Sequence, residues 1–130
     1  MANAITRVSN STGQAVVYAS AARTAEPDTQ EFEAAGYRGL HLIIDVTAVT
    51  DTPSIVATIL GVDRASGKTY TILASAAITA TGTTVLRVGQ SLTAATNLVA
   101  NDILPPIFRI RVTHADADSI TYTVGAMLCV

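Results

Sequence analysis

Residues 107–126 read IFRIRVTHADADSITYTVGA, and this stretch decides the fold class. Apolar and polar side chains alternate on both sides of a short polar turn at residues 115–119. Alternation with a period of two is typical of a strand that buries one face, and two such runs around a polar turn predict a β-hairpin. Phe108, Ile110 and Val112 would face the core, with Arg109 and Arg111 on the other side.

The same period recurs in most of the chain, which predicts an all-β protein. A second hairpin is expected around the turn at residues 63–67, where Asp, Ser and Gly favour a tight reversal. We expect about seven strands in an antiparallel β-sandwich or small barrel. The expected strands cover residues 14–20, 40–47, 55–62, 69–74, 83–88, 107–113 and 120–126.

Two stretches lack a clear period. Residues 75–81 are rich in Ala and could form a helical turn or a bend, and residues 89–106 read as a long loop in which residues 92–99 could be a short helix. Residues 1–38 are expected to form an N-terminal strand and an acidic connector or arm, with a mobile N-terminal segment. Residues 39–130 would then form the β-sandwich core, and the whole chain is expected to be one domain.

The composition is unusually poor in charge: 14 % of the residues are charged, 49 % are hydrophobic, and the chain has 22 Ala and 19 Thr. Such a surface is close to neutral, and covering it with a partner carries a low desolvation cost. The net charge of −2 and the pI near 5.5 argue against nucleic-acid binding, which requires a clustered basic face.

Membrane insertion and disulfide formation are also not expected. The longest nearly apolar stretch, residues 15–22, is interrupted by Ser20 and is far shorter than the roughly 20 residues that span a bilayer. The N-terminus lacks the basic start and apolar core of a signal peptide. Cys129 is the single cysteine, so an intrachain disulfide is impossible.

No constellation of residues points to catalysis, and we expect no enzyme activity, cofactor or metal. His41 and His114 have no supporting motif, and nucleotide-binding and nucleophile-elbow motifs do not occur. Asp116 and Asp118 resemble a fragment of a calcium loop, but the further oxygen ligands are missing. Both carboxylates, like that of Asp63, are interpreted as turn residues that accept backbone hydrogen bonds.

Three segments carry a family resemblance: residues 39–47 (GLHLIIDVT), residues 60–68 (LGVDRASGK) and residues 108–125, which span the opening pattern. Together they resemble the small β-rich structural proteins encoded among the head and tail genes of tailed bacteriophages. The resemblance covers roughly residues 39–126 and implies a noncatalytic virion protein. Its partners would be the major capsid protein or other virion proteins, and its location would be the virion, after synthesis in the host cytoplasm.

Within that class the favoured hypothesis is a capsid decoration (cement) protein that forms homo-oligomers and binds the major capsid lattice. The alternative is a tail or neck component, including a β-module that binds the host surface. Two segments are the candidates for partner contacts, the acidic N-terminal stretch and the long loop. The residues singled out in them are Glu26, Asp28, Glu31, Glu33, Leu92, Leu98 and Leu104.

Overall fold

The computed structural model describes residues 5–7, 13–34 and 36–130, and it confirms the all-β class. None of the described residues is helical, so the helical alternatives for residues 75–81 and 92–99 are wrong. The strands are β1 (Ile5–Arg7), β2 (Gln14–Arg23), β3 (Gln30–Glu33), β4 (Gly39–Val49), β5 (Ile55–Val62), β6 (Thr69–Ala74), β7 (Gly82–Gly89), β8 (Val99–Asn101), β9 (Ile107–His114) and β10 (Ile120–Cys129).

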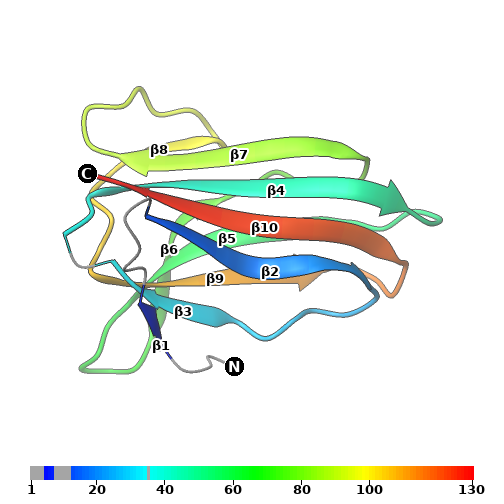
Figure 1. The fold of residues 1–130 in the computed structure, drawn as a ribbon, viewed down its shortest axis with the longest axis horizontal. Coiled ribbons are helices and arrows are strands. Elements are labelled where there is room, and N and C mark those ends of the chain that lie inside the picture. Colours follow the sequence, from blue (N-terminus) through cyan, green and yellow to red (C-terminus); the bar gives the residue numbers. More distant parts are fainter. Residues whose placement is uncertain (1–4, 8–12, 35) are drawn as a thin grey trace.

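The strands form two five-stranded sheets that face each other as a sandwich (Figure 1). The β9 sheet has the order β1-β3-β9-β5-β6, and the β4 sheet has the order β2-β10-β4-β7-β8. Every expected strand is present. The strands beyond the expected seven are β1, β3 and β8, which are three or four residues long and too short for a period of two to stand out.

The predicted hairpin between β9 and β10 is wrong, although both strands exist. β9 pairs with β3 and β5, whereas β10 pairs with β2 and β4 in the opposite sheet. The turn between them is therefore a corner that crosses from one sheet to the other. It runs beside the β4–β5 connection, to which it is tied by hydrogen bonds from Thr50 N to Ser119 O and from Ala115 N to Ser54 O. By contrast, β5 and β6 pair as the predicted antiparallel hairpin.

The core fills the space between the two sheets. The apolar faces predicted for β4, β9 and β10 all point inward, and Phe108, Ile110 and Val124 are completely buried. Phe32 of β3 stacks on Phe108, with ring centroids 5.5 Å apart. The short strand β3 is thus held in the sandwich by its single aromatic side chain as well as by its ladder with β9.

The described part of residues 1–38 belongs to the same sandwich as residues 39–130. β2 forms an edge of the β4 sheet, and β3 lies between β1 and β9 in the β9 sheet. Tyr18 of β2 ties the two sheets together, because its buried hydroxyl donates to the carbonyl oxygens of Asp28 (2.6 Å) and Ile110 (3.3 Å). The predicted mobile N-terminal segment includes residues 1–4 and 8–12, which lie outside the described residues.

Candidate partner-binding surface

The long loop, residues 89–106 between β7 and β9, presents apolar side chains to solvent. Leu92, Leu98 and Ile103 are 36 %, 47 % and 54 % exposed, respectively. Leu104, a predicted partner contact like Leu92 and Leu98, is only 2 % exposed and belongs to the core. A partner cannot reach Leu104 on the folded chain, so the prediction that Leu104 contacts a partner is wrong.

This loop is fixed by hydrogen bonds to the sandwich. The amide of Arg87 in β7 donates to Leu98 O, and the side-chain amide of Asn97 donates to Ala74 O. Asn97 and Ser91 adopt the left-handed backbone region, with φ of 62° and 63°. Ser91 N donates to the side-chain oxygen of Asn101, which closes the first half of the loop. The exposed leucines are therefore held in place before any partner arrives.

The acidic N-terminal stretch divides into residues that face solvent and residues that do not. Glu26 and Asp28 are exposed in the connection between β2 and β3, and Glu33 is half-buried at the end of β3. Glu31 is 4 % exposed and is occupied within the chain. Of the four acids predicted to contact a partner, Glu31 is thus not accessible.

Two arginines from distant parts of the chain surround Glu31. Arg109 Nε of β9 lies 2.7 Å from Glu31 Oε1, and Arg64 Nη2 of the β5–β6 turn lies 3.0 Å from Glu31 Oε2. Burial alone would raise the pKa of this carboxyl, but hydrogen bonds and charge from the two arginines outweigh burial and lower its pKa. Glu31 is therefore an ionised structural residue that joins β3, β9 and the turn.

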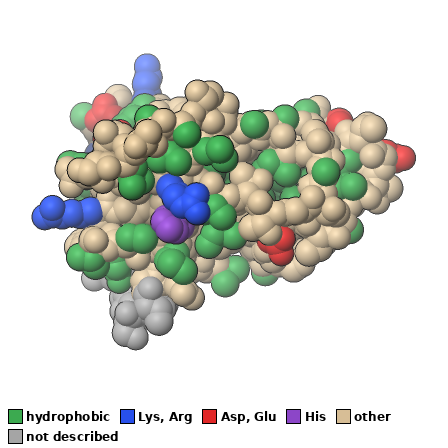
Figure 2. Space-filling model, turned by 90° about the horizontal axis from the view of Figure 1, so that it is seen from above, with side chains coloured by type: hydrophobic (Ala, Val, Ile, Leu, Met, Phe, Trp, Pro, Cys, Tyr) green, Lys and Arg blue, Asp and Glu red, His purple; other side chains and the backbone are tan. Residues whose placement is uncertain are grey.

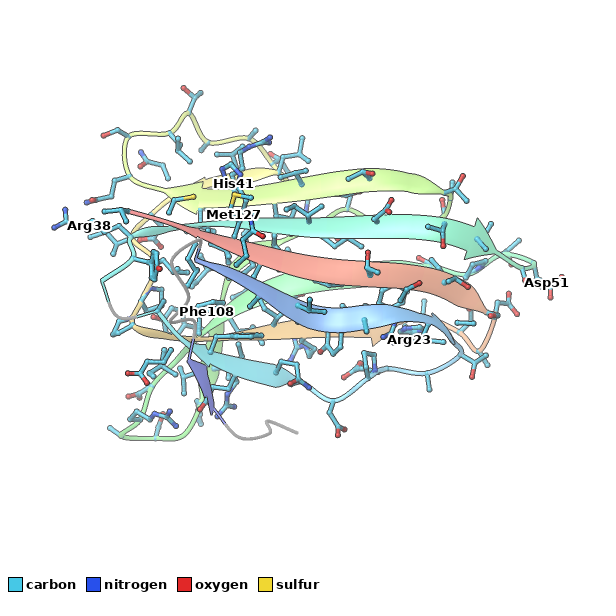
Figure 3. The ribbon with its side chains drawn as sticks, viewed as in Figure 1. Arg23, Arg38, His41, Asp51, Phe108 and Met127 are labelled. Carbon is cyan, nitrogen blue, oxygen red and sulfur yellow. The ribbon has the colours of Figure 1, made fainter. Side chains whose placement is uncertain are left out.

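The outer face of the β4 sheet is a second exposed surface. Strand register places three rows of outward side chains across β10, β4 and β7, and His41 and Met127 of the first row lie side by side (Figure 3). The rows are Met127, His41 and Arg87, then Gly125, Ile43 and Val85, then Thr123, Asp45 and Thr83.

The middle row is apolar and contains a hollow. Gly125 has no side chain, and no heavy atom lies within 4 Å of the position that its Cβ would take. Val16 of β2 pairs with Gly125 and is 74 % exposed. The resulting depression of about 320 Å³ is lined by Gln14, Ala15, Val16, Ile43, Gly125, Ala126 and Met127. Sequence alternation places Ile43 on this face, but it cannot show that Val16 joins it from β2.

A cluster of polar and aromatic groups joins Arg23, at the end of β2 (Figure 3), to side chains of β10 and β9. The Arg23 guanidinium lies 4.5 Å from the centroid of the Tyr122 ring and donates to the carbonyl oxygens of Tyr122 and Ala19. His114 Nε2 lies 2.9 Å from the Tyr122 hydroxyl. Burial raises the pKa of Tyr122 to about 12 and lowers the pKa of His114 below its ordinary value of 6.5. These groups are partnered within the fold and stabilise it.

The aspartates of the two turns accept local hydrogen bonds, as their sequence context predicts. Asp63 accepts from Ala65 N and from the Ser66 hydroxyl, and these bonds lower the pKa of its carboxyl. Asp116 accepts from Asp118 N. Asp118 in turn accepts from the amide and hydroxyl of Thr52, which ties the two inter-sheet corners together.

In the part of the chain that the structure describes, no group of three or more His, Cys, Asp or Glu side chains is arranged to hold a metal ion. The described residues also include no helix long and apolar enough to cross a membrane. Comparison with family models, with curated proteins and with solved structures finds no match to this chain.

Proposed function

We propose that this chain is a noncatalytic structural protein of a tailed-bacteriophage virion, specifically a capsid decoration protein that binds the major capsid lattice. The observation that carries the proposal is the long loop, which holds Leu92, Leu98 and Ile103 in solvent on a hydrogen-bonded backbone. An apolar loop that is already ordered loses little conformational entropy when a partner covers it.

The charge distribution supports a large contact with a protein lattice. Figure 2 shows few charged side chains, most of them well separated, with apolar and neutral polar groups between them. Contacts made by such a surface leave few charges to desolvate. The exposed carboxylates of Glu26 and Asp28, at the connection between β2 and β3, supply a separate negative site that could meet basic groups of the lattice.

The test is binding of the purified chain to capsid shells that lack it, measured by co-sedimentation and then by electron microscopy. We expect saturation at a fixed copy number per lattice unit, with the long loop at the shell surface. The paired substitution Leu98→Ser and Ile103→Ser should abolish binding without unfolding the protein. Val49→Ser is the matched control, since Val49 is 36 % exposed at the far end of β4 and outside the loop.

Two results would overturn the proposal. One is the absence of saturable shell binding, together with location of the chain at the tail or neck of native particles, which would favour the alternative of a tail component. The other is full shell binding by the Leu98 and Ile103 variant, which would show that the loop is not the contact.

A further inference from the structure

We propose that a second copy of this chain covers the outer face of the β4 sheet, so that the protein is a two-fold symmetric dimer with the central row at its axis. This inference goes beyond the proposed capsid binding and does not depend on it, because it concerns the free protein. The observations that carry it are the order of charges along the three rows, the apolar centre and the size of the face.

The charges are arranged asymmetrically about the central row. His41 and the exposed Arg87 lie on one side of Ile43 and Val85, and Asp45 lies on the other. Asp45 accepts a hydrogen bond from the hydroxyl of Thr83, 3.1 Å away, which orients the carboxylate within its row. The face therefore has a basic side and an acidic side separated by an apolar stripe.

Two identical faces can be related by a two-fold axis in the interface plane, and the charges decide its direction. An axis along β4 would place His41 against His41 of the second copy, with no carboxylate opposite either. An axis across the strands, along the central row, places His41 opposite Asp45 of the second copy. Arg87 then lies opposite Thr83 of the second copy, one strand spacing to the side of Asp45, and the same pairing recurs on the other side of the axis. Only this second arrangement makes the charges complementary.

The same axis also packs the apolar groups. Val16, Ile43 and Val85 of each copy would each meet its counterpart at the axis, so that the exposed Val16 side chains of the two copies would cover each other. Among the strand residues whose side chains the structure describes, Val16 is the most exposed large apolar one. Its burial against its counterpart would remove a large apolar side chain from water.

The face has about the area that a specific dimer needs. The four long strands β2, β10, β4 and β7, spaced about 4.8 Å apart over about eight residues of about 3.3 Å each, give on the order of 500 Å² per copy. The two copies would together bury on the order of 1,000 Å², about the least that a specific interface requires. Sheets that pack face to face in this way cross at about 30° because of their twist.

The experiment is sedimentation equilibrium of the purified full chain over a micromolar concentration series. We expect a species of twice the 13.4 kDa chain mass. Ile43→Glu, at the axis, should shift the chain to monomer, because it brings two carboxylates together. Thr113→Glu is the matched control, since Thr113 is an exposed strand residue of the other sheet, and this variant should remain dimeric.

A charge exchange tests the direction of the axis. Asp45→Arg alone and Arg87→Asp alone should each weaken the dimer at least tenfold, and the double variant should recover most of the loss. Circular dichroism confirms that each variant is folded. A monomeric wild-type chain, a trimer, or a dimer unaffected by Ile43→Glu would overturn the proposal. A monomeric chain that loses shell binding on Ile43→Glu would show instead that the capsid covers this face.

Discussion

Substitution of Glu31 by Gln should destabilise the protein by about 2 kcal/mol, since it removes a buried charge from between two arginines. The Glu31 carboxylate is 4 % exposed, and the Arg109 side chain that it contacts at 2.7 Å is 21 % exposed. Removing one partner of a fully buried pair costs about 3–5 kcal/mol. Partial access of water to Arg109 reduces that figure, and Gln can still accept one hydrogen bond.

The two arginines should differ in their contributions. Arg109→Met keeps the aliphatic stem of the side chain and should cost about as much as Glu31→Gln, because it leaves the carboxylate buried with one partner. Arg64 is 56 % exposed, so solvent screens its interaction with Glu31. Arg64→Met should therefore cost no more than about 0.5 kcal/mol.

Urea unfolding followed by far-UV circular dichroism measures these differences in the free energy of unfolding. The corresponding fall in Tm for Glu31→Gln is roughly 8 °C.

The pH dependence of stability tests whether the charge of Glu31 is the cause. Since folding lowers the pKa of Glu31 below its ordinary value of 4.5, its stabilisation is complete above that value and is lost as the pH falls below it. The gap between wild type and Glu31→Gln should narrow on acidification. A loss below about 0.5 kcal/mol, or an Arg64 variant as unstable as the Arg109 variant, would refute the reasoning.

Two further predictions concern the leucines of the long loop and the partly buried His114. Leu104→Ala should cost about 2–4 kcal/mol of unfolding free energy because Leu104 is 2 % exposed, whereas Leu98→Ala, at a 47 % exposed position, should cost under about 1 kcal/mol in the same urea titration. The lowered pKa of His114 means that the unfolded chain binds its proton first, so stability should decline as the pH falls below 6.5. His114→Gln should flatten that decline, and an unchanged pH profile would contradict the assignment to His114.

Sequence alternation predicts the seven long strands, and it predicts the buried faces of β4, β9 and β10, because a period of two follows from backbone geometry alone. It does not predict which strands pair. Residues 107–126 have the pattern of a hairpin, yet β9 and β10 lie in opposite sheets. Each strand still buries every second side chain in the core between the sheets, so the alternation is the same as it would be in a hairpin. The choice depends on contacts with distant strands such as β4 and β5, which a local pattern does not contain.

The candidate contacts show the same limit. Four acids within residues 23–35 suggest a solvated connector. However, Phe32 is buried in the core, and the neighbouring Glu31 pairs with Arg109 in the β9 sheet, so that Glu31 is buried as well. The four residues Gln30-Glu31-Phe32-Glu33 are too few for a period of two to predict this strand. The arginines that neutralise Glu31 lie 33 and 78 residues away along the chain. Composition likewise cannot distinguish Leu98 from Leu104, because both belong to one aperiodic loop.

The two exposed surfaces meet at β7, which allows both proposed contacts to exist together. Arg87 presents its side chain on the outer face of the β4 sheet, while its backbone amide binds Leu98 O of the long loop. A dimer across the outer face would leave the loop of each copy uncovered and would carry two loops on one rigid body. Attachment of the first loop would then raise the effective concentration of the second at the lattice, provided that their spacing matches neighbouring subunits. A nearly neutral chain with modest single contacts could in this way bind a capsid tightly, without any further interface.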